Sequence, residues 1–165
     1  LLEEVTDRGD GGFDVVSMVE LIEHVEEPRS FLREARRLLR PGGCLYITTP
    51  NAWSLNRWIL ASAWSVFAPP DHITIFTARG LHRLLRSEGF DIAATHTEGL
   101  NPFEVARRFR RRPSATPLHR VDAGLRLCQS LSSSPQRRLV KKAANLVLSA
   151  IGVGDTIKLT ARRTR

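Results

Sequence analysis

Continuous apolar runs and one helical pattern alternate in the first part of the chain. Residues 13–19 form an apolar run that predicts a strand with no wet face, which is typical of parallel sheets. Residues 28–39 begin with a proline and repeat apolar side chains at helical spacing, and the Pro-Gly-Gly of residues 41–43 predicts the turn that ends this helix. Residues 44–49 form a second β-rich run. Strand, helix and strand together predict a right-handed βαβ unit in a parallel sheet.

Further elements are predicted after this unit. Residues 51–70 contain all three tryptophans and predict a helical excursion that a pair of prolines ends. Thr77 predicts the N-cap of a helix that stops at Gly89, and residues 90–97 predict another strand. Residues 155–161 alternate apolar with polar side chains, which predicts a final strand.

Basic residues are concentrated in the C-terminal part of the chain, which accounts for the formal net charge of +8. Arginines crowd residues 107–112, and a short helix is predicted over residues 121–131. In a later helix we expect the core face to be formed by Leu139, Ala143, Leu146, Val147 and Ala150, with basic side chains opposite. Few aromatic residues lie among the charges, so no specific nucleic-acid surface is expected. Peripheral membrane contact through this basic region is an alternative to a solvated helical face.

Length and composition describe one ordinary globular domain. The chain has 165 residues, of which 42% are hydrophobic and 25% charged, so it can bury a core without disulfides. Cys44 and Cys128 lie far apart, which excludes a disulfide framework or cysteine-ligated zinc and favours a reducing, cytoplasmic location. No charge-free run reaches the roughly 20 residues of a membrane span. The chain opens on Leu1 and its only methionine is Met18, so we expect it to be part of a longer translated chain.

Two loops follow the strands of the predicted βαβ unit. Residues 20–25 come directly after the first strand and contain Glu20, Glu23 and His24. Residues 49–53 come directly after the second strand. In an open parallel sheet, ligands bind beyond the carboxyl ends of the strands, where loops converge. Since the two strands are expected to be neighbours, both loops should border one cleft.

The residues of this unit carry a family resemblance. The segment FDVVSMVELIEHVEEPRSFLREARRLLRPGGCLYITTPN, residues 13–51, resembles the second half of a class I S-adenosylmethionine-dependent methyltransferase. The shared features are an FD-led strand, an EHV-type loop, a helix before Pro-Gly-Gly and a strand ending in TPN. The resemblance continues through His72 and the EGF of residues 88–90, and covers about residues 10–98. The subgroup it resembles most is the ubiquinone-biosynthesis O-methyltransferase type.

This resemblance implies an α/β, Rossmann-like class I methyltransferase fold, truncated to a C-terminal half-sheet of four strands with helices on both faces. We expect one partial domain over residues 1–165, with the core strands and helices in residues 1–100 and a basic helical segment and final strand in residues 101–165. The family's Gly-rich cofactor loop has no counterpart in the GDGG of residues 9–12 or the GVG of residues 152–154. We therefore expect this chain alone to bind the cofactor poorly and to expose an apolar edge.

The resemblance also implies S-adenosylmethionine as the cofactor and assigns residues to it. Met18, Val19 and Glu20 would lie along the cofactor, with Glu20 near the sulfonium. His24 is the candidate general base or acceptor orienter, because imidazole titrates near neutral pH, and Glu23 belongs to the same catalytic group. The alternatives are an ordinary strand end for the first three residues and a loop-fixing role for His24.

Other residues are candidates for the acceptor side of the site. His72 resembles the family's histidine in the segment that covers the substrate, and a turn residue is the alternative. A divalent metal held by Glu20, Glu23 and His24, with Asn51 or His72 completing the shell, is a further alternative. Because this spacing is weak evidence by itself, the sequence leads us to assign no metal.

The expected function is transfer of a methyl group to oxygen of a small or lipid-like acceptor, in the longer parent chain. Trp53, Trp58 and Trp64 would cover an aromatic or lipid acceptor, with at least one of them in the core. Transfer to nitrogen, carbon or a sugar is an alternative, as is a non-catalytic half-domain that serves as a docking module. The sequence predicts no oligomeric state, and it favours the cytoplasm or the surface of a membrane as the location.

Overall fold

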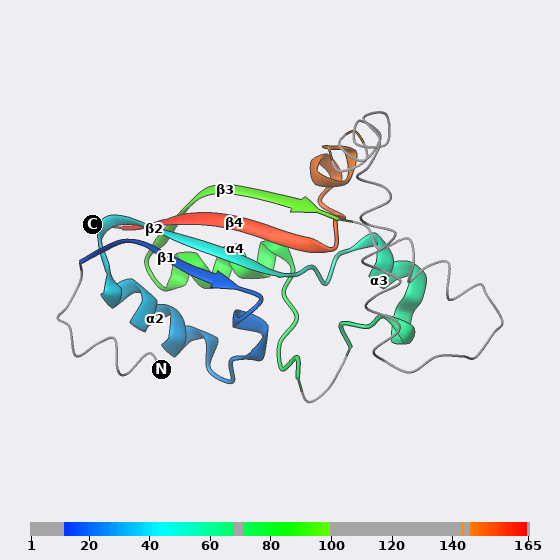
Figure 1. The fold of residues 1–165 in the computed structure, drawn as a ribbon, viewed down its shortest axis with the longest axis horizontal. Helices are drawn as coiled ribbons and strands as arrows, with labels where there is room; N and C mark the ends of the chain where they lie inside the picture. The colour runs from blue at the N-terminus through cyan, green and yellow to red at the C-terminus, as the bar shows by residue number, and fades with distance from the viewer. Residues whose placement is uncertain (1–11, 68–70, 100–142, 144–145, 165) are drawn as a thin grey trace, which may run out of the picture.

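The computed structural model describes residues 12–67, 71–99, 143 and 146–164. Four strands form one sheet in the order β1-β2-β4-β3 (Figure 1). β1 runs parallel to β2, whereas β4 is antiparallel to both of its neighbours, β2 and β3. The predicted strand, helix and parallel strand are therefore confirmed. The strands are β1 (Phe13–Val19), β2 (Leu39–Pro50), β3 (Phe90–Glu98) and β4 (Thr156–Arg163).

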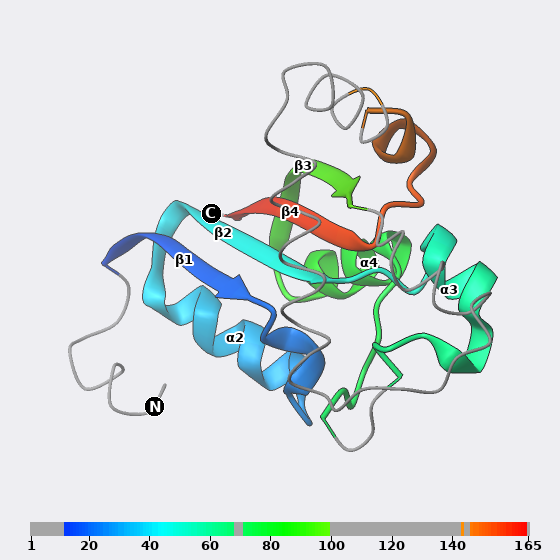
Figure 2. The ribbon, with the colours of Figure 1, turned by 45° about the vertical axis from the view of Figure 1, so that its right-hand side comes forward.

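Helices cover the sheet unequally. α2 and α4 lie on one face of the sheet, and the helical segment of residues 146–151 lies on the opposite side (Figures 1 and 2). α3 extends beyond the end of the sheet rather than covering a face. The helices are η1 (Ile22–His24), α2 (Pro28–Leu38), α3 (Leu55–Leu60), η2 (Ala61–Ala63) and α4 (Ala78–Ser87), of which η1 and η2 are short 3-10 helices.

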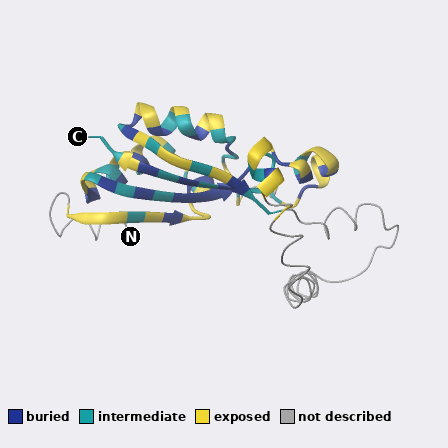
Figure 3. Cartoon of the chain, turned by 90° about the horizontal axis from the view of Figure 1, so that it is seen from above, coloured by how far each residue is buried: buried dark blue, intermediate teal, exposed yellow. Residues whose placement is uncertain are grey.

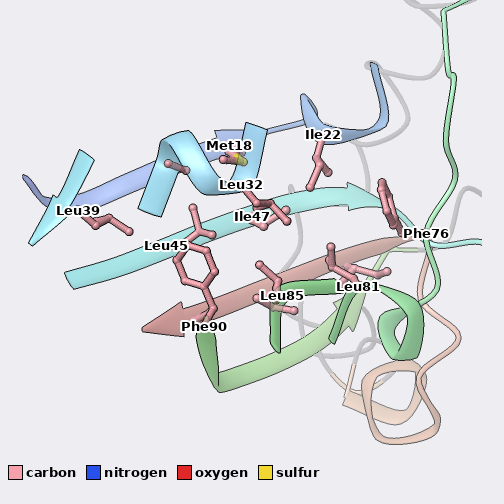
Figure 4. Close-up of a cluster of buried hydrophobic side chains, with 14 residues drawn as sticks. Met18, Ile22, Leu32, Leu39, Leu45, Ile47, Phe76, Leu81, Leu85 and Phe90 are labelled. Atoms are coloured by element: carbon pink, nitrogen blue, oxygen red, sulfur yellow. The ribbon is translucent and has the colours of Figure 1, made fainter. Parts of the chain in front are cut away.

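The main core lies between the sheet and the pair α2 and α4 (Figure 4). Leu45 and Ile47 of β2 point to this face and are fully buried, as is Leu159 of β4, which pairs with Ile47. Leu32 of α2 and Leu85 of α4 belong to the same cluster. Each side chain of this size stabilises the fold by about 1.5–3 kcal/mol when it is fully buried. The core therefore holds both helices against the two central strands.

Local signals in the sequence place the helix ends. Pro28 occupies the first turn of α2, where its missing N–H leaves no hydrogen bond unmade. The Thr77 hydroxyl accepts a hydrogen bond from the Gly80 N–H at 3.1 Å and caps α4, as predicted. Gly89 then takes a φ of +79°, which a residue with a Cβ rarely adopts, and turns the chain into β3.

β2 begins earlier than the sequence predicts. It starts at Leu39, directly after α2, so the Pro-Gly-Gly segment lies inside the strand and not in a turn before it. The pairing register with β1 shifts between Phe13 and Val15, and residues 40–43 bulge out at that shift. Gly42 supports the bulge with a φ of +76°. The prediction of a separate turn is therefore wrong, because the residues on both sides of the bulge remain paired with β1.

The last helix is predicted correctly in kind but not in orientation. Residues 146–151 are helical. Leu148 is its buried residue, whereas Leu146 and Val147 are 73% and 60% exposed and Ala150 is also exposed. The prediction that Leu146, Val147 and Ala150 face the core is therefore wrong. Helical spacing alone does not determine which side of a helix packs against the sheet.

Several expectations lie outside the described residues. These are the arginine-rich residues 107–112, the helix predicted over residues 121–131 and most of the GDGG segment. Among the helices that the structure does describe, none has the length and apolarity to cross a membrane.

β1 forms one edge of the described sheet. Its only strand partner there is β2, and Phe13, Val15 and Val19 are 46%, 58% and 62% exposed. The outer strands carry exposed residues, while the central strands are largely buried (Figure 3). The expected apolar edge is confirmed. The expectation that this strand has no wet face is wrong for the described part, since no neighbour there covers its outer side.

Candidate functional site

The candidate site lies at the carboxyl ends of β1 and β2. The two strands are in parallel register up to the pair Val19 and Thr48. Beyond them the Thr49 hydroxyl donates a hydrogen bond to Oε2 of Glu23 at 2.9 Å. The predicted meeting of the two loops at one edge of the sheet is therefore confirmed, because this bond joins one loop directly to the other.

Glu20 turns the chain as it leaves β1. Its φ of +48° is unusual for a non-glycine residue, and its N–H donates to the Thr48 carbonyl at 3.0 Å. Partial burial of its carboxyl group raises the pKa of Glu20, and the nearby Glu23 carboxylate acts in the same direction. A hydrogen bond with Thr48 opposes that rise. The residue as a whole is exposed, so its carboxyl group is accessible to a ligand.

Met18 and Val19, the other two residues assigned to the cofactor, point in different directions. Met18 is 2% exposed and belongs to the core cluster beneath the sheet (Figure 4). Val19 is 62% exposed. The Met18 side chain therefore packs inside the protein, whereas Val19 presents an apolar surface where β1 ends.

Glu23 is a buried carboxylate in η1. It is 1% exposed, and while Oε2 accepts the Thr49 hydrogen bond, Oε1 has no hydrogen-bond partner among the described residues. Its main-chain carbonyl accepts hydrogen bonds from the N–H groups of Ile73 and Thr74, at 2.9 and 3.1 Å. Glu23 thereby ties the segment after residue 70 to the end of β1.

This tie brings two histidines together. The rings of His24 and His72 are 4.8 Å apart between centroids and inclined by 46°. Nδ1 of His24 lies 2.5 Å from the Asp71 carbonyl oxygen, and Nδ1 of His72 lies 2.6 Å from that of Val66. Since a carbonyl oxygen only accepts, each Nδ1 carries a proton, and in the neutral form of the imidazole the lone pair is then on Nε2. Nε2 of His24 is 4.0 Å from Oε1 of Glu23.

Asn51, named as a candidate ligand, has a different role. Its amide nitrogen donates to the carbonyls of Gly152 and Gly154, at 3.0 and 2.7 Å, and its Oδ1 accepts from the Trp53 N–H at 3.0 Å. These bonds employ its amide nitrogen and oxygen alike. Asn51 therefore holds the loop before β4 against the end of β2 and does not serve the histidine pair.

The three tryptophans divide between core and surface. Trp64 is 3% exposed and packs edge-on against Phe67, as expected for at least one of them. Trp53 and Trp58 are 53% and 58% exposed. Their ring centroids are 4.9 Å apart, and the rings are in a T-shaped arrangement. The Trp53 loop adjoins the segment that follows His72, because the N–H of Ala52 donates to the Phe76 carbonyl at 2.8 Å.

Two parts of the site were missed by the sequence reasoning. The Thr49 hydroxyl donates a hydrogen bond to the Glu23 carboxylate. The sequence indicates that its loop follows a strand, but it does not indicate this contact. The carbonyls of Val66 and Asp71 orient the histidines, but a main-chain group leaves no residue-type signal. These contacts can be identified only in the three-dimensional structure.

Comparisons with known proteins agree with this arrangement. A family model described as "Methyltransferase domain" matches residues 2–95. The ubiquinone biosynthesis O-methyltransferase of Caulobacter vibrioides is 34% identical over 90 residues, which are 46% of this chain and 36% of that protein. Its counterpart in Methylococcus capsulatus is 32% identical over 107 residues, or 61% of this chain and 45% of that protein. The chain thus spans less than half the length of these relatives.

Solved structures show the same fold at low sequence identity. A SAM-dependent methyltransferase from Thermotoga maritima gives a TM-score of 0.56 at 18% identity, over 94% of this chain and 57% of that one. A SAM-dependent methyltransferase from Archaeoglobus fulgidus gives a TM-score of 0.56 at 15% identity. This match covers 98% of this chain and 64% of that one. Since the matched family domain covers more than half of the residues, the chain belongs to the methyltransferase domain family, with the Rossmann-like fold of the S-adenosylmethionine-dependent members.

Proposed function

We propose that this chain is part of an S-adenosylmethionine-dependent methyltransferase that methylates an oxygen atom of a small, lipid-like acceptor. The observation that carries this proposal is the cluster of Glu23, His24 and His72 beyond the carboxyl ends of two parallel strands. A hydroxyl acceptor must lose its proton during the transfer, and this cluster supplies lone pairs for that proton. The names of the O-methyltransferase relatives support the same choice of acceptor atom.

The end of β1 fits part of the cofactor. Glu20 presents a partly buried carboxyl group, which would complement the positive charge of a sulfonium, and exposed Val19 offers an apolar contact for an adenosyl group. When bound, S-adenosylmethionine supplies the electrophilic methyl group. The described residues offer no Gly-rich strand-to-helix turn for the amino-acid end of the cofactor.

His24 is the residue of this chain that is placed to accept the acceptor's proton. Its Nδ1–H is engaged by the Asp71 carbonyl, which leaves Nε2 free and fixes the ring. The Glu23 carboxylate, 4.0 Å from that nitrogen, would stabilise the imidazolium that forms. The ring of His72, whose centroid is 4.8 Å from that of His24, would orient the hydroxyl group of the acceptor.

The lipid-like character of the acceptor is proposed from the surface beside this cluster. The side chains of Trp53 and Trp58 contact each other and are both exposed. Leu55 and Ile59 on α3 are each 37% exposed. The loop that carries Trp53 adjoins the chain that carries His72. An apolar tail packed on the tryptophans would leave its polar head close to the histidines.

Methyl transfer to matched acceptors tests the proposed function. The protein, expressed with the coding sequence that precedes Leu1, is incubated with methyl-labelled S-adenosylmethionine and either a phenol or the corresponding aniline, each with and without an apolar tail. We expect label on the phenol oxygen and faster transfer when the tail is present. Label on the aniline alone would exclude oxygen as the acceptor, and equal rates without the tail would exclude a lipid-like one.

Cofactor binding tests the dependence on residues outside this chain. We expect calorimetry with S-adenosylmethionine to show no micromolar binding to the 165 residues alone and clear binding when the upstream sequence is included. Micromolar binding by this chain alone would contradict the prediction. Absence of binding in both proteins would favour the alternative of a non-catalytic docking module.

A further inference from the structure

We propose that Asn51, supported by the Gly-Val-Gly segment of residues 152–154, is a positioning residue that determines where the apolar tail of the acceptor binds. The inference rests on the proposed function, because it takes the exposed tryptophans as the surface for that tail. Asn51 stands between Thr49, whose hydroxyl bonds to the carboxylate beside the two histidines, and Trp53. An immobile Asn51 therefore keeps the histidines and this tryptophan at a set distance.

The Asn51 side chain is buried and hydrogen-bonded at both ends of its amide. It is 0% exposed. Its nitrogen donates to the carbonyls of Gly152 and Gly154, at 3.0 and 2.7 Å, and its oxygen accepts from the Trp53 N–H at 3.0 Å. An amide has two N–H donors on one atom and an acceptor on the other, which this position requires. An aspartate of the same size would instead place carboxylate oxygens against two carbonyl oxygens.

The segment that accepts these hydrogen bonds is itself fixed. Gly154 lies so close to β3 that a Cβ on it would come within 2.5 Å of the main-chain nitrogen of Glu98. The Gly154 N–H donates to the Thr97 hydroxyl at 3.1 Å, and Thr97 is 3% exposed. Any side chain at residue 154 would push the segment away from β3. Asn51 is therefore bonded to a part of the fold that has little freedom to move.

The same segment holds α3, which extends beyond the end of the sheet (Figure 2). The N–H of Leu55, the first residue of α3, donates to the Val153 carbonyl at 2.9 Å. The Asn56 amide donates to the Asp155 carboxylate at 2.6 Å, and Asn56 is 0% exposed. Because α3 carries Trp58, both tryptophans of the exposed pair depend on the chain just before β4.

An exposed aromatic surface thus stands on a buried polar support. Trp53 and Trp58 are more than half exposed, whereas the side chain of Asn51 is inaccessible to solvent. Buried hydrogen bonds allow few alternative arrangements, because a polar group that loses its partner there cannot turn to water. The surface is therefore ordered before the acceptor binds, which lowers the entropic cost of binding. Loss of the support should weaken binding of the tail more than binding of the reacting ring.

Methyl transfer by the N-terminally extended protein to the tailed and untailed phenols tests the inference. Asn51→Asp keeps the size of the side chain and removes both N–H donors. We expect the KM of the tailed phenol to rise by more than about tenfold and that of the untailed phenol by less than about threefold. Glu88→Gln, which weakens a buried carboxylate's ion pairs between α2 and α4, is the control for a general loss of stability. It should leave the preference for the tail unchanged.

A second pair of variants decides the matter if circular dichroism shows that Asn51→Asp does not fold. Leu55→Pro removes the N–H that reaches Val153, and proline is tolerated at the first position of a helix. Leu55→Ala removes the same side chain and keeps the N–H. We expect the proline variant to lose more of the preference for the tail than the alanine variant. An equal loss in both would overturn the role of the segment.

The remaining outcomes separate this inference from the proposed function. An unchanged preference in folded Asn51→Asp, or an equal loss in Glu88→Gln, would overturn the positioning role. If the unaltered extended protein methylates neither phenol or shows no preference for the tail, the proposed function fails. The support is then measured by tryptophan fluorescence anisotropy of the 165-residue chain, in which Trp53 and Trp58 are the exposed tryptophans. Asn51→Asp should lower this anisotropy and Glu88→Gln should not, and an unchanged value in Asn51→Asp would refute the support.

Discussion

At the scale of single residues, the site depends on how Glu23 is held. A buried carboxylate is unfavourable unless hydrogen bonds or charges compensate for the water it has lost. One oxygen of Glu23 receives the Thr49 hydroxyl, and its backbone carbonyl receives two N–H groups from the segment that carries His72. The same residue therefore positions an acidic side chain and organises the loop that brings the second histidine.

Removing the Thr49 hydroxyl tests this hold. Thr49→Val keeps the side-chain shape but leaves Oε2 of Glu23 buried without its donor. We expect the free energy of unfolding to fall by about 1–3 kcal/mol, measured by urea denaturation. Thr160→Val, at a partly buried threonine of β4, is the matched control and should change stability less. Equal losses in the two variants would show that the hydrogen bond to Glu23 contributes nothing specific.

His24 gives the sharpest prediction about activity. If the N-terminally extended protein transfers methyl groups as proposed, His24→Ala should lower its turnover by at least about 100-fold, because the change removes the group that accepts the hydroxyl proton. Turnover is measured with methyl-labelled S-adenosylmethionine, and His96→Ala serves as the control. An unchanged rate in His24→Ala would assign the residue to fixing the loop through Asp71.

At the scale of elements, one carboxylate links the two core helices. Glu88, at the end of α4, pairs with Arg29 and Arg33 of α2 at 2.7 and 2.8 Å. The hydrogen bond from Arg33 is the main reason that the pKa of Glu88 is lowered, and Arg29 adds to the effect. These pairs join two helices that β2, α3 and η2 separate along the chain, on the face where both helices cover the sheet.

The pH dependence of stability follows from this lowered pKa. Because the pKa of Glu88 is lower in the folded protein than its ordinary value of 4.5, the ion pairs contribute their full stability above that pH. The contribution is lost as the pH falls through the folded-state pKa. Unfolding measured from pH 7 to pH 3 should show this acid loss, and Glu88→Gln should reduce it. Glu34→Gln, in a more exposed pair with Arg37, should leave it intact, and an identical loss in both variants would contradict the assignment.

At the scale of the whole molecule, the edge formed by β1 sets how the chain meets other surfaces. Phe13, Val15 and Val19 are exposed along a strand whose only described partner is β2. Exposed strand edges with apolar side chains tend to pair with other strands. The edge therefore favours association of the isolated chain.

Association through this edge can be measured directly. We expect the isolated chain to self-associate with rising concentration in sedimentation experiments, and Val15→Lys to reduce that association by placing a charge on the open edge. Ala94→Lys, at an exposed position of the opposite outer strand β3, is the control and should leave association unchanged. A monomer at all concentrations would show that the β1 edge is not available for pairing.

The sequence by itself determined most of the local structure. An apolar run located β1, and an alternation of apolar and polar residues located β4. The Thr77 cap and Gly89 located α4, and the motifs of residues 13–51 indicated the family. These features are readable because they depend on neighbours in the chain: a cap, a positive φ and an alternation of side chains all act over a few residues.

Only the tertiary structure decided which distant groups meet. It placed β4 between β2 and β3, turned Leu148 inward, assigned Asn51 to the loop before β4, and set His72 beside His24 through main-chain bonds to Glu23. Spacing along the chain contains no information on these contacts, because main-chain carbonyls look alike at every residue and strand order depends on packing of the whole sheet. The sequence supplied the carboxylate and the imidazoles, and the fold brought them within reach of one ligand.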